Sequence, residues 1–349
     1  MNKEELIEST KRMNKINYDV KEEIAKESDN ICLICKKQIT SFCNSHSIPH
    51  YIFNHMNLEN GEIIPHYNAA QKEILTKVEK GKNNSGIFKL ICNECDQNFF
   101  SKLDNFDIIN GKWNNELLRL QAQRINLFNI YRIKEHSYTL YKMYESQLTK
   151  ERIENDKKYV QDQIKYYKES FNKYNNDDSI KFNILFDEVL DYETNFTVVN
   201  NLSMIFNPCL DIMIANDIVD TLKFESYELE PDKFFTICHL DKIHNNDMYV
   251  VVLPYNGKTR VTLFCDSNSI CNVIVKNDFD SINRDNILLY ISSTLIISGR
   301  NIYGNQKFMK EYRKAGEIFK KQFYKKYNGK DYPQLSTFDI KEQYLYIYD

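Results

Sequence analysis

The sequence predicts an α+β protein in which a cysteine-rich module is joined by long helices to a β-rich region. Three observations lead to this fold class. Apolar residues recur at helical spacing near the N-terminus and again over residues 113–174. Two Cys-x-x-Cys pairs flank a polar segment. Beyond residue 180 the apolar pattern changes to the alternation that is typical of β-strands.

The helical elements are expected in two places. Residues 1–28 show apolar residues at helical spacing among charged ones. The residues that carry this pattern are Leu6, Met13, Ile16, Val20 and Ile24. Residues 113–174 contain no proline or glycine and predict one bent helix or two antiparallel helices, within a connector at residues 111–175.

A C-terminal α+β domain is expected over residues 180–349, after a boundary rich in Asn, Asp and Ser. The pair Asn256-Gly257 predicts a tight hairpin between residues 250–254 and 260–265. The expected strands lie within residues 181–189, 196–206, 234–240, 248–265 and 271–276. This domain shows no catalytic constellation, so the sequence assigns it no role.

Composition limits the classes of protein to which the chain can belong. No run of eighteen apolar residues is present, so no membrane partner is expected. The N-terminus is charged and lacks the apolar segment of a secretory signal, which predicts a cytoplasmic protein. Because thiols stay reduced there, the nine cysteines are interpreted as metal ligands or buried residues. The net charge of −3 argues against non-specific coating of nucleic acid.

Two cysteine pairs, Cys32/Cys35 and Cys92/Cys95, have the spacing of metal-binding knuckles. Each Cys-x-x-Cys turn brings two sulfurs to one side, so the pairs together can supply the four thiolates of a structural Zn²⁺ site. We place this zinc module at residues 29–110. Two unrelated pairs of buried cysteines, or a redox pair, are the alternatives. The remaining cysteines are expected to be small buried residues: Cys43, Cys209, Cys238, Cys265 and Cys271.

The segments between and after the cysteine pairs carry a further motif. Residues 45–49 read Ser-His-Ser-Ile-Pro, Asp96 follows the second pair directly, and Phe100 and Asp104 come later. With the two pairs, residues 31–105 resemble the HNH endonucleases of the ββα-metal type, which are built on a treble-clef zinc module. That family often has an acidic residue before His-Ile-Ile-Pro, and then Cys-x-x-Cys-Asn with a glycine and a later Asp.

The resemblance implies a role for each matching residue. His46 is implied as the general base that activates water, a task that suits the near-neutral pKa of imidazole. Asp96 is implied as a ligand of a catalytic Mg²⁺ or Mn²⁺, and Asp104 as a residue that orients a ligand or His46. Two positions depart from the family: Ser45 replaces the usual acidic ligand, and Phe100 replaces glycine. A degenerate module that does not cleave is the alternative.

A basic, aromatic-rich helix is expected within residues 283–327. Between Arg300 and Lys330, ten Lys or Arg residues stand against two Glu. Such side chains neutralise phosphates, and exposed aromatic rings stack on bases. An amphipathic helix with its aromatic face in the core is the alternative, and residues 113–174 are a second candidate surface. The residues expected to contact nucleic acid are Lys307, Lys310, Arg313, Lys314, Lys320 and Lys321.

The sequence as a whole predicts a metal-dependent HNH-type nuclease, with DNA favoured over RNA as substrate. Nucleases of this build resemble bacterial effectors of antiviral defence. The alternative is a non-catalytic, zinc-stabilised module that binds nucleic acid or protein, and a third hypothesis is an assembly protein with a purely structural zinc. A second copy of the chain or a protein partner is expected to bind through the helical connector or the C-terminal domain.

Overall fold

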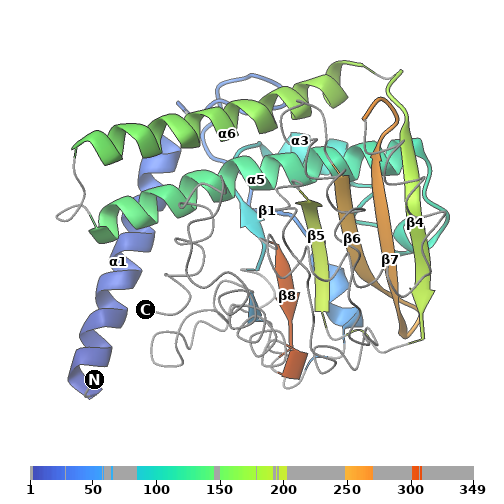
Figure 1. Cartoon of the computed structure of the whole chain (residues 1–349), viewed down its shortest axis with the longest axis horizontal. Helices are drawn as coiled ribbons and strands as arrows, with labels where there is room; N and C mark the ends of the chain where they lie inside the picture. The colour runs from blue at the N-terminus through green and yellow to red at the C-terminus, as the bar shows by residue number, and fades with distance from the viewer. Residues whose placement is uncertain are drawn as a thin grey trace, which may run out of the picture. The chain divides into compact units, whose positions relative to one another are not determined.

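The computed structural model describes residues 3–27, 29–56, 58, 64–65, 85–144, 150–177, 179–191, 194, 196–202, 248–269, 301–305 and 307–308. The chain divides into two compact units, Met1–Pro49 with Gly86–Ile180 and His50–Ser85 with Lys181–Asp349. The described residues form both helices and a sheet, which confirms a mixed helix-and-sheet fold (Figure 1). The domain boundaries that the sequence suggests stay predictions.

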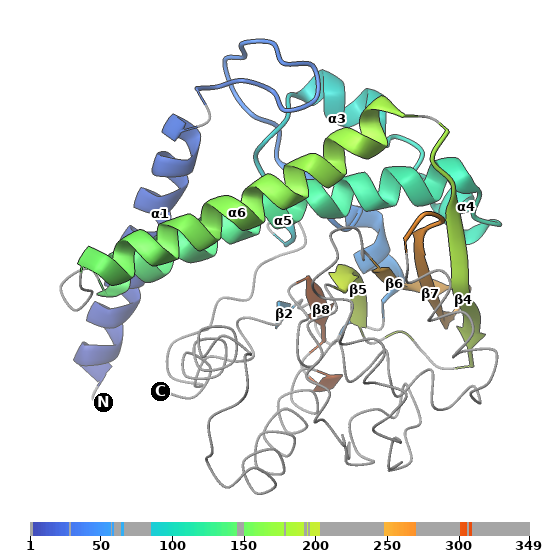
Figure 2. The same cartoon turned by 45° about the horizontal axis from the view of Figure 1, so that its top comes forward.

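The first unit is mainly helical and contains a short two-stranded sheet. Its elements are α1 (Lys3–Glu27), β1 (Ser45–His46), β3 (Ile87–Phe88), α3 (Asn93–Phe100), α4 (Phe106–Asn110), α5 (Asn115–Tyr144) and α6 (Lys150–Asn176). The sequence left open one bent helix or two helices over residues 113–174, and the structure has two. They lie side by side in both views of the chain (Figures 1 and 2).

Helix α5 is the core of the first unit. It begins after Asn114, whose side chain accepts a hydrogen bond from the Leu117 N–H at 3.0 Å and so satisfies a free donor of the first turn. Every residue from 120 to 131 is buried. Helix α6 contributes three buried aromatic residues at helical spacing: Tyr167, Phe171 and Tyr174. Neither α5 nor any other helix in the described part of the chain is long and apolar enough to span a membrane.

Helix α1 packs against α5 through apolar and charged side chains. Val20 and Ile24 are buried, as expected for the apolar face of an amphipathic helix. At its C-terminal end, the Glu27 carboxylate lies 3.3 Å from Lys134 Nζ and accepts a hydrogen bond from the Tyr138 hydroxyl. Exposed ion pairs contribute only about 0.2–1 kcal/mol each, so the apolar contacts provide most of the stability of this packing.

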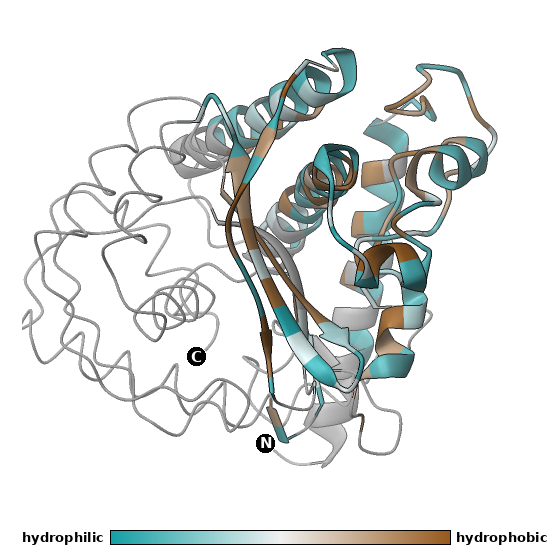
Figure 3. Cartoon of the chain, turned by 90° about the vertical axis from the view of Figure 1, so that its right-hand side faces the viewer, coloured by the Kyte–Doolittle hydropathy of each residue, from teal (hydrophilic) through white to brown (hydrophobic). Residues whose placement is uncertain are grey.

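The second unit contains a six-stranded antiparallel sheet in the order β2-β8-β5-β6-β7-β4. Its elements are the 3-10 helix η1 (His50–His55) and the strands β2 (Ile64–Pro65), β4 (Phe182–Leu190), β5 (Phe196–Leu202), β6 (Met248–Tyr255), β7 (Lys258–Asp266) and β8 (Ile302–Gly304). Every residue of β6 and β7 is buried except Tyr255 and Lys258, which lie next to the turn between the two strands. Strands buried on both faces read as continuous hydrophobic runs, and Figure 3 shows long hydrophobic stretches along the strands.

The hairpin predicted from Asn256-Gly257 is confirmed. Strands β6 and β7 pair across it, with Tyr255 opposite Lys258. Both turn residues have positive φ, 47° for Asn256 and 78° for Gly257. A two-residue turn of this kind matches the twist of the strands that flank it, and asparagine and glycine are the residues that adopt it most easily.

The helix predicted over residues 283–327 is wrong at Ile302–Gly304, which form β8. Tyr303 pairs with Thr197 of β5 on one side and with Pro65 of β2 on the other. Ile302 and Tyr303 are buried, and both residue types favour a pleated, packed surface. Pairing with strands distant in the sequence thus decides the conformation here. The predicted strands at residues 234–240 and 271–276, and most of the predicted basic helix, lie outside the described residues.

Candidate metal centre

The first cysteine pair lies in a tight turn that follows α1. The Cys32 N–H donates to the Lys37 carbonyl at 3.0 Å, and the Lys36 N–H donates to the Cys32 carbonyl at 2.9 Å. Lys36 has a left-handed backbone, with φ of 60°. These bonds hold the sulfurs of Cys32 and Cys35 on one side of the turn.

The second cysteine pair begins helix α3. Cys92 is the residue that precedes the helix, and Cys95 lies in its first turn. The Cys92 N–H donates to Cys32 Sγ at 3.4 Å, so the two knuckles are already in contact. The predicted Cys-x-x-Cys elements therefore come together although 56 residues separate them.

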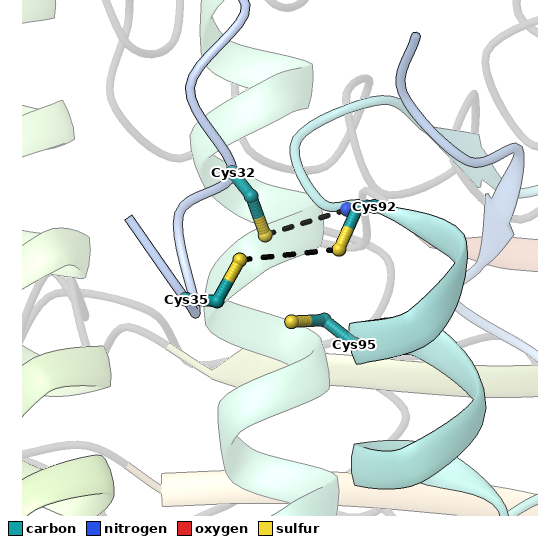
Figure 4. Close-up of side chains that lie close together, drawn as sticks. All are labelled: Cys32, Cys35, Cys92 and Cys95. Carbon is teal, nitrogen blue, oxygen red and sulfur yellow. Dashed lines mark hydrogen bonds between the residues drawn. The ribbon is translucent and has the colours of Figure 1, made fainter. Parts of the chain in front are cut away.

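The four sulfurs form one cluster that fits a zinc ion. The sulfur atoms all lie within 4.8 Å of one another, and Cys35 Sγ is 4.0 Å from Cys92 Sγ. Figure 4 shows the four side chains converging on a common point. A tetrahedral Zn²⁺ with Zn–S bonds of about 2.3 Å places its sulfurs about 3.8 Å apart. The structure thus contains a four-cysteine site that can hold a metal such as zinc: Cys32, Cys35, Cys92 and Cys95.

The electrostatics of the cluster also favour a cation. Burial raises the pKa of the Cys95 thiol well above its usual value, and its hydrogen bonds with Cys92, Cys35 and Cys32 raise it further. Without a metal, the Cys95 thiol therefore stays protonated. A divalent cation stabilises the thiolates instead, and its binding releases protons.

His46 lies on the two-stranded antiparallel sheet of the first unit. Strands β1 and β3 pair antiparallel, with Ser45 opposite Phe88 and His46 opposite Ile87. The Ser47 N–H extends the pairing by donating to the Gly86 carbonyl at 2.8 Å. The Ser45 side chain is fully buried. In chain order, Cys32 and Cys35 precede β1, Cys92 lies between β3 and α3, and Cys95 lies within α3.

Asp96 lies on α3, one turn beyond Cys92, to whose carbonyl its N–H donates at 3.0 Å. Its Oδ2 accepts a hydrogen bond from Cys43 Sγ at 3.6 Å. Its Oδ1 is buried and has no hydrogen-bond partner among the described residues. The carboxylate thus has one oxygen engaged by a thiol and one oxygen that can accept a proton or a metal.

The hydrogen bond between Cys43 and Asp96 is a contact that the sequence did not predict. It is only partly buried and bonds to Asp96, so its interpretation as an apolar core residue is wrong. Burial raises the pKa of this thiol most, and the charge of Asp96 adds to the increase. Cys265, in contrast, is buried as expected.

Asp104 pairs with a buried arginine of α5. Arg124 Nη2 lies 2.8 Å from Asp104 Oδ1, and its guanidinium stacks 4.6 Å from the centre of the Phe100 ring. The Arg124 side chain is 1% exposed and the Asp104 side chain 44%. Phe100 is fully buried, and its ring serves as the platform for this arginine.

The remaining predicted site residues are not gathered into a second cluster. Within the described ranges, the four cysteines are the one set of three or more His, Cys, Asp or Glu residues with ligand atoms this close together. Mg²⁺ needs fewer protein ligands, since it is often held by one or two carboxylates with water and phosphate. Lys307 is exposed, as its predicted contact with nucleic acid requires. The other predicted contacts lie outside the described residues: Lys310, Arg313, Lys314, Lys320 and Lys321.

Comparison of the chain with family models, with curated proteins and with solved structures finds no match. The assignment of a function therefore depends on the residues of this site and on their geometry.

Proposed function

We propose that the chain is a metal-dependent nuclease of the HNH type that hydrolyses phosphodiester bonds, with DNA favoured over RNA. The observation that supports this function is the order of elements around the cysteine cluster. His46 lies on β1 of a two-stranded antiparallel sheet, and Asp96 lies on α3, the helix that follows the partner strand β3. The two residues are thus tied to one small element whose helix begins at a zinc knuckle.

The chemistry assigns one task to each of these side chains. His46 accepts a proton from water, which then attacks the phosphorus atom. Asp96 would hold the catalytic cation through its buried Oδ1, the oxygen to which no described residue donates a hydrogen bond. A bound Mg²⁺ or Mn²⁺ would stabilise the charge at the leaving oxygen. A structural zinc would take no part in the reaction and would fix the relative positions of the two-stranded sheet and α3.

The test is a cleavage assay with purified zinc-loaded protein. Plasmid, linear duplex, single-stranded DNA and RNA are incubated with Mg²⁺, with Mn²⁺ and without an added cation. Cleavage that requires the cation and is lost in His46→Ala is the expected result. His55→Ala is the matched control, since His55 is an exposed histidine of the second unit, and it should cleave as the wild type does.

A non-catalytic zinc module that binds nucleic acid is the second candidate. Two observations favour it: a buried Ser45 occupies the place of an acidic ligand, and the Cys43 thiol occupies one oxygen of Asp96. Mn²⁺ titration followed by electron paramagnetic resonance separates the candidates. The nuclease is expected to bind one Mn²⁺ that Asp96→Asn loses. A protein that binds nucleic acid, does not bind Mn²⁺ and does not cleave would favour the second candidate.

A further inference from the structure

A thiol and a carboxylate meet beside the second zinc knuckle. Cys43 Sγ lies 3.6 Å from Asp96 Oδ2, although 53 residues separate the two in the sequence. Neither residue belongs to the four-cysteine cluster. Both residues are partly exposed, so the contact is not sealed in the core. We call Cys43 and Asp96 the thiol–carboxylate pair.

The spacing of the thiol–carboxylate pair is that of two ligands of one metal ion. A tetrahedral Zn²⁺ with a Zn–S bond of about 2.3 Å and a Zn–O bond of about 2.1 Å places the sulfur and the oxygen about 3.6 Å apart. The Cys43 and Asp96 atoms have this separation. The second carboxylate oxygen, Asp96 Oδ1, is buried and receives no hydrogen bond from a described residue, so it can also coordinate.

Backbone hydrogen bonds fix the positions of the two residues. The Cys43 N–H donates to the Ile91 carbonyl at 2.8 Å, and the Asp96 N–H donates to the Cys92 carbonyl at 3.0 Å. Ile91 and Cys92 are adjacent, so the thiol and the carboxylate are tied to the same short segment. A cation that binds the thiol–carboxylate pair meets donors that are already in place, and little conformational entropy is lost.

We propose that the thiol–carboxylate pair is a second metal site, for a thiophilic divalent cation such as Zn²⁺ or Co²⁺. Such cations accept sulfur together with oxygen, whereas Mg²⁺ takes oxygen ligands. The cation replaces the proton of the Cys43 thiol, which passes to water. Water or phosphate completes the coordination. With two protein ligands this site binds more weakly than the four-cysteine cluster and fills after it.

The inference goes beyond the proposed function and rests on it in one respect. Asp96 is also the residue proposed to hold the catalytic Mg²⁺ or Mn²⁺. A thiophilic cation held by the thiol–carboxylate pair would therefore compete with the catalytic cation for the same carboxylate.

The test uses Co²⁺ as the probe. Protein loaded with one equivalent of Zn²⁺ is titrated with Co²⁺, which binds such ligands less tightly than Zn²⁺ and so leaves the four-cysteine cluster filled. One Co²⁺ is expected to bind and to give a charge-transfer band from thiolate to cobalt. Asp96→Asn should weaken this binding by more than the about 10–100-fold that is typical for a residue that only supports a ligand. Glu94→Gln is the matched control, since Glu94 is an exposed carboxylate in the same turn of α3, and it should bind Co²⁺ as the wild type does.

Two variants of Cys43 test the sulfur ligand. Cys43→Ala should lose the charge-transfer band, and Cys43→Ser, which keeps the size of the side chain, should lose it as well. The spectrum of Co²⁺ bound in the four-cysteine cluster should not change in either variant. A wild-type protein without the band, or a band that survives in Cys43→Ala, overturns the inference. So does a loss of the band that comes with a loss of zinc, because Cys43 then only supports the knuckle.

The inference and the proposed function fail in different ways, because cobalt binding is measured without nucleic acid. Co²⁺ bound through Cys43 in a protein that cleaves nothing would uphold the inference and refute the nuclease. Metal-dependent cleavage by a protein that binds no Co²⁺ through sulfur beside its zinc would uphold the nuclease and refute the inference.

Discussion

Replacement of Cys35 by serine tests the metal centre most directly. A serine hydroxyl stays protonated near neutral pH and is a poor zinc ligand, so Cys35→Ser removes one of four thiolates. Cys35 Sγ and Cys92 Sγ are 4.0 Å apart, within about 0.2 Å of the spacing in a zinc tetrahedron. The site is therefore preformed, and the loss should appear as lost coordination rather than as a rearrangement.

The magnitude follows from the free energy of structural zinc sites. That free energy is about 10–16 kcal/mol near neutral pH, so an equal share for one of four ligands is about 3 kcal/mol. A loss of about 3 kcal/mol weakens zinc binding about 100-fold, since about 1.4 kcal/mol corresponds to a factor of ten. Competition with a chromogenic chelator measures this ratio, and Co²⁺ substitution reports the number of thiolate ligands through its absorption spectrum.

Cys43→Ser is the matched control for this measurement. Cys43 belongs to the same unit and bonds to Asp96, but it is not one of the four clustered cysteines. Its variant should keep the zinc affinity and the cobalt spectrum of the wild type. Equal affinity in Cys35→Ser and the wild type, or an equal loss in Cys43→Ser, would refute the assignment of the four ligands.

Three further predictions concern the stability of the fold. Asp104→Asn leaves the buried Arg124 charge without its carboxylate and should lower the free energy of unfolding, measured in urea, by about 1–2 kcal/mol. This is less than the loss of about 3–5 kcal/mol for a fully buried pair, because the Asp104 side chain is 44% exposed. Arg124→Met removes that charge and should lower the free energy of unfolding less than Asp104→Asn does. A larger loss in Arg124→Met than in Asp104→Asn would contradict the pairing. Gly257→Ala should cost about 1 kcal/mol from its positive φ alone, since an added Cβ meets no atom within 4 Å; unchanged stability would contradict the turn geometry. Burial and Glu27 raise the pKa of Tyr138. The fold therefore favours the neutral phenol, and the resulting stability should be present below the unfolded pKa of about 10 and be lost as pH rises above it. Tyr138→Phe should reduce this loss as pH rises above about 10, and an unchanged pH profile would exclude the contact.

The features that sequence reasoning predicts well depend on nearby residues. The turn at Asn256-Gly257 is specified by the two residues that adopt positive φ, and the alternation on either side follows directly. Each Cys-x-x-Cys knuckle is likewise a local turn, so its geometry is set by four residues. Long helices without proline or glycine are also predicted from the residues within them.

The features that sequence reasoning misses depend on distant residues. Strand β8 forms because Tyr303 pairs with Thr197 and Pro65, and no local pattern near Tyr303 specifies those partners. The bond between Cys43 and Asp96 spans 53 residues and exists only once the knuckles have met. Arg124 reads as a surface residue of a charged helix, yet it is buried because Phe100 and Asp104 lie over it.

The two metals of the proposed nuclease are linked through one helix. Helix α3 follows Cys92 directly and carries Cys95 and Asp96 in its first turn, so loss of zinc should loosen the anchor of the helix that positions the carboxylate. Chelation would therefore abolish cleavage even though zinc takes no part in the reaction. Mn²⁺ bound to a zinc-loaded Cys43→Ala protein avoids this ambiguity, because the thiol bond to Asp96 Oδ2 is removed while the four zinc thiolates remain. If Asp96 holds the catalytic cation, freeing its second oxygen should strengthen Mn²⁺ binding, whereas an unchanged or absent Mn²⁺ signal would favour the binding module.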